Sequence, residues 1–158
     1  MNICASSGAG KRLPTHREII DAYYTALSVM DVDAFEALHH PDVVYNISGS
    51  TIISGRYDSF AALKAVLPAI FEALDFEQFR FATKWQMMNG GADGATAIME
   101  AEGVARNGQR YDQRYVHIFS FRDGKIASVH EFFDTQLAND ALGFSGKAPF
   151  EADGPFIF

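Results

Sequence analysis

The sequence predicts an α+β fold in which helices pack on one face of a curved antiparallel sheet. Apolar residues recur at steps of three and four in the first half of the chain, which is typical of amphipathic helices. From Gln78 the period changes to two, which is typical of half-buried strands. The segment Tyr111–Asp134 has two apolar runs around an Asp-Gly pair, which indicates a long hairpin. The 158 residues suit one domain with a sizeable core.

Two helices and a strand are expected first. Thr15 and Glu18 have the spacing of a capping box, so a helix should begin there, with Tyr23 on its apolar stripe. The segment Asp31–Asp33 supplies a fresh N-cap for a short second helix. A short strand over 43–47 should follow.

A third helix is expected from Asp58 or Ser59 to about Leu74. Pro68 lies inside its apolar pattern and should kink the helix or divide it, because proline lacks the N–H that the helix needs. The turn-rich segment 48–56 before it predicts a loop or a short edge hairpin.

Four strands are then expected as a meander, beginning with 78–87 and 95–105 and ending with the hairpin of 111–134. In the 95–105 strand, small apolar residues alternate with a mixed set, so either face could point inward. The first set is Ala97, Met99 and Ala101, and the second is Ile98, Glu100 and Glu102.

The hairpin turn decides which side chains share a face. With a three-residue loop at Arg122–Gly124, His117 is expected opposite Val129, and Tyr115 opposite Glu131. One face would then carry an imidazole and a carboxylate among aromatic residues. With a two-residue loop the faces exchange, so that His130 joins His117 and Glu131 leaves.

Composition narrows the classes of ligand and partner that the protein is expected to bind. Aromatic residues make up 13% of the chain, with 14 phenylalanines, which favours an apolar pocket for a small hydrophobic molecule. The net charge is −7 and no basic cluster occurs, so nucleic acid is not an expected partner. Neither a signal peptide nor a membrane span is recognisable, which predicts a cytoplasmic protein without a membrane partner.

The chain is expected to divide into three parts. Residues 1–14 are expected to be a flexible N-terminus and 15–135 the domain. Residues 136–158 are expected to be an irregular tail that serves as a lid over a cavity or as an arm in a dimer. Cys4 is the only cysteine, so neither an intrachain disulfide nor a cysteine zinc site is expected. The cluster His39-His40 with Asp42 is not expected to bind metal.

The hairpin Y-D-Q-R-Y-V-H-I-F-S-F-R-D-G-K-I, followed by H-E-F-F-D-T, resembles the SnoaL-like polyketide cyclase group. The segments A-L-S-V-M-D-V-D-A-F-E-A-L and V-V-Y-N-I add to this resemblance, which covers about residues 15–137. The group belongs to the NTF2-like, or ketosteroid isomerase-like, superfamily. The resemblance implies a cone-shaped sheet wrapped around about three helices, an internal apolar cavity, and a homodimer formed through the outer sheet face.

The resemblance also assigns expected site residues. Ketosteroid isomerases use an Asp base with an oxyanion hole made by a Tyr and a protonated Asp. Those positions correspond here to Ile47, Tyr23 and His117, and an isoleucine cannot abstract a proton. The cyclases are closer, because His117 and Glu131 match their His and acidic positions, although Glu131 is longer than the Asp of the cyclases.

The expected activity is general acid-base chemistry at a carbon next to a carbonyl group, without metal or cofactor, in cyclisation, isomerisation or dehydration. Glu131 is expected to be the base or acid, His117 a proton shuttle or a donor to an enolate oxygen, and Tyr23 a second donor. The ligand is expected to contact seven further residues: Tyr45, Ile47, Trp85, Tyr115, Phe119, Val129 and Phe133.

Several alternatives stay open. Glu131 could instead pair with Arg114 or Arg56 as a structural ion pair, and His117 could be a core histidine bonded to Tyr115 or Glu131. The protein could then be a non-catalytic binding protein for a hydrophobic ligand, or a dimerising interaction module if side chains fill the cavity. Dehydration in the manner of scytalone dehydratase ranks lower, because the expected register places one histidine in the cavity.

Overall fold

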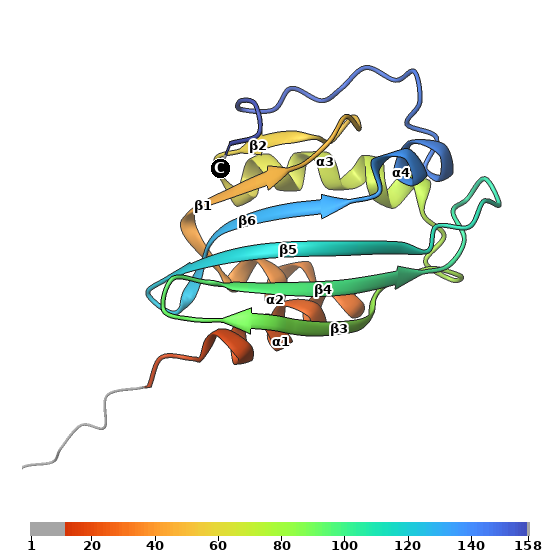
Figure 1. The fold of residues 1–158 in the computed structure, drawn as a ribbon. Coiled ribbons are helices and arrows are strands. Elements are labelled where there is room, and N and C mark those ends of the chain that lie inside the picture. The colour runs from red at the N-terminus through yellow and green to blue at the C-terminus, as the bar shows by residue number, and fades with distance from the viewer. Residues whose placement is uncertain (1–11, 158) are drawn as a thin grey trace, which may run out of the picture.

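The computed structural model describes residues 12–157, so most of the expected flexible N-terminus, 1–14, lies outside the described residues. Within these described residues, six strands and four helices follow one another along the chain, and Figure 1 shows their arrangement. They are α1 (His16–Ser28), α2 (Val32–Ala37), β1 (His39–Ile47), β2 (Gly55–Tyr57), α3 (Phe60–Ala73), β3 (Arg80–Gly90), β4 (Ala95–Glu102), β5 (Gln113–Arg122), β6 (Lys125–Phe133) and α4 (Thr135–Ala141).

The helices begin where the capping residues predict. The Thr15 side chain accepts from the Glu18 N–H at 3.2 Å, and the Glu18 carboxylate accepts from the Thr15 N–H at 2.7 Å, which confirms the capping box. Asp31 caps α2 and Ser59 caps α3. The helix α3 runs through Pro68 as one element, so a division there is wrong. Its buried residues include Leu63 and Val66, which lie one turn apart on the same side of the helix. Their packing against the core stabilises the helix.

The strands form one curved, open sheet in the order β2-β1-β6-β5-β4-β3. The meander from β3 to β6 confirms the prediction, whereas β1 pairs with β6 in parallel, so the sheet is mixed rather than wholly antiparallel. Strand β1 begins at His39 rather than at Val43. Helix α1 packs against β3 and β4, and α3 packs against β1 and β2, so the helices cover the concave face (Figure 1). This is the α+β cone that the resemblance implied, with a fourth helix added.

The inward face of β4 consists of the small apolar residues. Ala97, Met99 and Ala101 are buried against the helices. Glu100 lies on the outer face, where its carboxylate pairs with Arg114 of β5 at 3.2 Å. The small side chains leave room for the bulkier residues of β5 and β6 next to them.

The β5–β6 turn has two residues, Asp123 and Gly124, both with positive φ (54° and 73°). Arg122 pairs with Lys125, so the expected three-residue loop is wrong. A β-bulge then leaves Ala127 without a partner and moves the register by one residue.

The bulge restores the face that the shorter turn would have reversed. His117 lies directly opposite Glu131, and Tyr115 lies opposite Phe133, so the expected pairing of His117 with Val129 is wrong by one diagonal step. All of these side chains still point to the concave face, because the two changes add up to a shift of two residues, and such a shift keeps each side chain on its face. His130 points to the outer face instead.

The C-terminal segment begins with a helix, so the prediction of a wholly irregular tail is wrong for Thr135–Ala141. Asp134 caps α4 by accepting from the Leu137 N–H at 2.9 Å. The segment after α4 runs back along β2, where Arg56 exchanges backbone hydrogen bonds of 2.9 Å with Asp153 and Gly154.

The end of the tail lies on the outer face of the sheet. The His130 Nε2–H donates to the Ile157 carbonyl at 3.0 Å, and Phe156 packs against the rings of His130 and Phe132. The tail therefore covers the part of the outer face formed by β6, while the homodimer through that face stays a prediction. Within residues 12–157, no helix combines the length and the apolar character that a bilayer crossing requires.

Candidate functional site

A cavity of about 110 Å³ lies between the concave face of the sheet and the helices. One water needs roughly 10–15 Å³ on this measure, so the cavity is not filled by side chains. This observation counts against the interaction module, which required a filled interior. The apolar wall includes Leu27, Phe35, Leu63, Phe71, Phe81 and, from α4 and the segment after it, Ala138, Leu142 and Phe144. The polar residues at the cavity are Tyr23, Asp31, Tyr45, Tyr111, Tyr115, His117 and Glu131.

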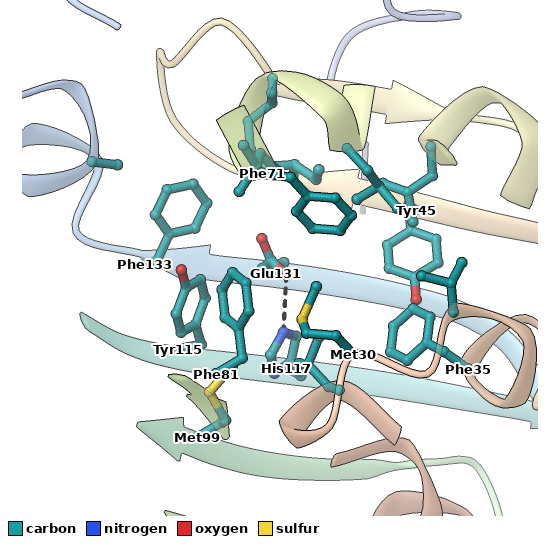
Figure 2. A pocket seen from close by; sticks show the side chains of 18 of the residues that line it. Met30, Phe35, Tyr45, Phe71, Phe81, Met99, Tyr115, His117, Glu131 and Phe133 are labelled. Atoms are coloured by element: carbon teal, nitrogen blue, oxygen red, sulfur yellow. Dashed lines mark hydrogen bonds and ion pairs between the residues drawn. The ribbon is translucent and has the colours of Figure 1, made fainter. Parts of the chain in front are cut away.

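Glu131 and His117 meet at the centre of this cavity (Figure 2). The His117 Nε2 lies 3.0 Å from the Glu131 Oε2, because the two residues are direct partners on β5 and β6. His117 is 1% exposed, and the Glu131 side chain keeps 19% of its surface exposed. The imidazole is therefore enclosed by protein, while the carboxylate reaches the space that a ligand can enter.

The other nitrogen of His117 is held by Tyr24, which the sequence analysis did not single out. The Tyr24 hydroxyl lies 2.8 Å from the His117 Nδ1, and both groups are buried. Tyr23 lies beside them and lines the cavity, but its ring only packs edge-on against His117 at 5.9 Å. Both tyrosines fall near the buried side of α1, so helical spacing alone could not tell which hydroxyl reaches the imidazole.

One arrangement of protons accounts for both hydrogen bonds of His117. Burial raises the pKa of Tyr24, so its hydroxyl keeps its proton and donates it to the His117 Nδ1. His117 then carries its proton on Nε2 and donates it to the Glu131 carboxylate. Within residues 12–157, the other carboxylate oxygen, Oε1, has no hydrogen-bond partner.

The alternative ion pairs of Glu131 are not formed. Arg114 pairs with Glu100 at 3.2 Å, and Arg56 pairs with Asp58 at 2.8 Å. Glu131 is thus a carboxylate with one fixed oxygen and one oxygen left for a ligand. A carboxylate oxygen in this position can accept a hydrogen bond or a proton from a bound ligand.

A second buried histidine, His39, lies behind Tyr45. The His39 Nδ1 lies 2.7 Å from the Phe35 carbonyl oxygen and its Nε2 lies 2.6 Å from the Tyr45 hydroxyl. Burial lowers the pKa of His39 to about 4. His40 lies outside this site and hydrogen-bonds to Arg122. Within the described part of the chain, no group of three or more His, Cys, Asp or Glu residues is placed to hold a metal ion.

The expected ligand contacts divide into two sets. Tyr45, Ile47, Tyr115 and Phe133 line the cavity. Three other residues expected there do not line it: Trp85, Phe119 and Val129. Phe119 and Val129 face the same side of the sheet but lie in the packed core beneath Tyr23. The Trp85 Nε1–H instead donates to Asp21 of α1 at 3.1 Å, which anchors the helix to β3.

Comparisons with known proteins agree with this fold. The model of the SnoaL-like domain family matches residues 20–129. A search of curated proteins finds no significant match.

Three solved structures with similar folds have low sequence identity to the chain. TerC co-crystallized with polyporic acid is 23% identical with a TM-score of 0.69, over 81% of this chain and 98% of that one. A putative polyketide cyclase from Pseudomonas putida KT2440 is 24% identical with a TM-score of 0.65, over 81% and 98%. An NTF2-like protein from Burkholderia thailandensis E264 is 24% identical with a TM-score of 0.68, over 82% and 98%. At these identities the likeness shows the fold alone.

Proposed function

Because the chain belongs to the SnoaL-like domain family, we propose that it is a small enzyme that moves a proton at a carbon next to a carbonyl group. Its ligand would be a hydrophobic cyclic compound, and the reaction a cyclisation, isomerisation or dehydration without a cofactor. The putative polyketide cyclase among the similar structures supports this class of reaction. The observation that carries the proposal is a carboxylate, Glu131, that is held at one oxygen and open at the other inside an apolar cavity.

The proposed base is the Oε1 of Glu131. It would take a proton from the carbon next to the carbonyl group, and the electron pair of that C–H bond would move to form an enolate. The Oε2 can keep its hydrogen bond from the His117 Nε2–H throughout, because that bond uses a different oxygen. Returning the proton to another carbon, or losing a leaving group from the enolate, would complete an isomerisation or an elimination.

His117 has a positioning role in this proposal rather than the role of a shuttle. Both of its ring nitrogens are engaged, one by Tyr24 and one by Glu131, so neither is free to donate to an enolate oxygen. The Tyr24–His117 pair would instead fix the Glu131 carboxylate in one orientation. Such placement contributes to rate because proton transfer requires a short, aligned approach.

The proposal can be tested with 1-tetralone, a small cyclic ketone with an exchangeable C–H next to its carbonyl. We expect the protein to catalyse hydrogen–deuterium exchange at that carbon in D₂O, measured by mass spectrometry. The variant Glu131→Gln keeps the shape of the side chain and should lower the rate by about 10²–10⁴-fold. Glu102→Gln is the matched control, because Glu102 is an exposed carboxylate of β4. Unchanged exchange in Glu131→Gln would eliminate Glu131 as the base.

A second candidate is a binding protein for a hydrophobic ligand. It is favoured by the fully hydrogen-bonded, buried state of His117, which resembles a structural histidine. The same experiment separates the candidates. Binding of 1-tetralone without any exchange above the background in D₂O would support the binding protein.

A further inference from the structure

The cavity has two tyrosine-bearing ends, with Glu131 between them. Tyr45 of β1 pairs with Val129 of β6, and Glu131 lies two residues further along β6. Phe133 lies two residues beyond Glu131 and pairs with Tyr115 of β5. Steps of two residues separate rows by about 7 Å along a strand. Figure 2 accordingly shows Tyr115 and Phe133 on one side of Glu131 and Tyr45 on the other.

At the Tyr45 end of the cavity, the hydroxyl proton of Tyr45 is not available to a ligand. The carbonyl oxygen of Phe35 can only accept, so the His39 Nδ1 must carry the proton of that 2.7 Å bond. Burial lowers the pKa of His39 to about 4, so its other nitrogen, Nε2, is unprotonated near neutral pH and accepts. The Tyr45 hydroxyl therefore donates to the His39 Nε2 at 2.6 Å. What remains at the Tyr45 oxygen is its capacity to accept.

Tyr23 lines the cavity next to this acceptor end, with its ring 5.9 Å from that of His39. Burial raises the pKa of Tyr23 well above its usual value, so its hydroxyl keeps its proton. The protons of Tyr45 and His39 thus both point away from the cavity, along a chain of hydrogen bonds that ends at the backbone of α2. The end presents oxygen lone pairs and recognises a hydrogen-bond donor.

At the opposite end, the Tyr111–Tyr115 pair has one hydroxyl proton that no group of the protein accepts. The hydroxyls of Tyr111 and Tyr115 are buried, line the cavity and lie 2.9 Å apart. Two hydroxyls carry two protons, and the hydrogen bond between them uses one. The neighbouring Gln113 does not take the second, because its Oε1 already accepts from the backbone N–H groups of Arg114 and Asp134. One proton of the pair is left to donate into the cavity.

We infer that the cavity selects a hydroxylated cyclic ketone and fixes its direction. The ketone oxygen lies at the Tyr111–Tyr115 pair and the ligand hydroxyl donates at the Tyr45 end. The acidic C–H then lies beside Glu131. The ligand class rests on the proposed function. The negative charge that develops on the ketone oxygen during proton removal forms at the end with the free donor, where it is stabilised most.

Three probes test the orientation of the ligand in the cavity: 1-tetralone, 6-hydroxy-1-tetralone and 6-methoxy-1-tetralone. The hydroxy compound can donate at its far end, and the methoxy compound only accepts. Isothermal titration should show about fivefold tighter binding of the hydroxy compound than of the methoxy compound to the wild-type protein. Tyr45→Phe should remove this preference. Retention of the preference in Tyr45→Phe, or no binding of any probe, would overturn the inference.

The hydrogen bond to the ketone oxygen is detected by infrared spectroscopy of 6-hydroxy-1-tetralone labelled with ¹³C at the carbonyl carbon. A hydrogen bond lowers the C=O stretching frequency, and a purely structural tyrosine would not affect it. We expect a lowered frequency in the wild-type protein and in each single variant, Tyr111→Phe and Tyr115→Phe, because one hydroxyl remains. The double variant should lose the shift, whereas a shift that persists there contradicts the inference.

The design separates this inference from the proposed function. If the double variant does not fold, Tyr45→Phe still decides, since the carbonyl shift must survive it and the preference for the hydroxyl must not. Direction-selective binding without deuterium exchange would refute the enzyme and leave the orientation intact. Exchange with no difference between the hydroxy and methoxy probes would refute the orientation alone.

Discussion

Acidification should destabilise this protein through His39, and the size of the effect follows from its surroundings. His39 is 4% exposed and its pKa is lowered from 6.5 to about 4, first of all by burial. Between these values the unfolded chain binds a proton that the folded chain excludes, so stability is full above pH 6.5 and falls as the pH drops toward 4. At about 1.36 kcal/mol per pH unit, the loss is about 3 kcal/mol.

The assay is urea unfolding at a series of pH values from 7.5 to 4, followed by circular dichroism. Carboxylates also titrate in part of this range, so the wild-type curve is compared with that of His39→Gln, which keeps an amide near the Tyr45 hydroxyl but cannot titrate. The wild-type free energy of unfolding should fall by about 3 kcal/mol more than that of the variant. Parallel curves for the two proteins would refute the neutral, buried state of His39 and, with it, the direction of the Tyr45 hydrogen bond.

Two further predictions concern the hairpin and its support. Tyr24→Phe should cost about 1–3 kcal/mol in urea unfolding, because it leaves the buried His117 Nδ1 without a donor, and should slow the exchange of 1-tetralone; unchanged stability and exchange would show that Tyr24 is dispensable. Deleting Ala127 removes the bulged residue but leaves Glu131 opposite His117, because the residues after the bulge keep their partners on β5, so the variant should fold cooperatively by circular dichroism and keep its exchange activity. A folded deletion variant without exchange activity would contradict the register argument.

Local sequence patterns predicted much of the fold. The Thr15–Glu18 capping box, the caps at Asp31 and Ser59 and the meander all form as their residue types require. The bulge at Ala127 could not be predicted, because nothing in the run K-I-A-S-V-H-E marks one residue as unpaired. The inward direction of Glu131 was nevertheless predicted, since the turn and the bulge together shift the register by two residues, which keeps each side chain on its face.

The site was predicted less completely, because hydrogen-bond partners depend on packing between elements. Glu131 and His117 share a strand pair and could be related by alternation. Tyr24 reaches His117 from α1, and no sequence pattern relates helix rotation to a strand 93 residues away. His39 was considered only as part of a possible metal cluster with His40 and Asp42, because the strand was expected to begin at Val43. Its place at the start of β1 turns it inward toward Tyr45.

The route of the tail also bears on how the protein avoids self-association. Strand β2 lies at one border of the sheet, where unpaired backbone groups invite a strand from another molecule. The backbone N–H of Arg56 instead donates to the Gly154 carbonyl, and its C=O accepts from the Asp153 N–H. This border is therefore covered by the protein's own chain. A protein shortened before Asp153 would expose the unpaired backbone N–H and C=O groups of β2, and we expect it to aggregate at concentrations at which the full chain stays in solution.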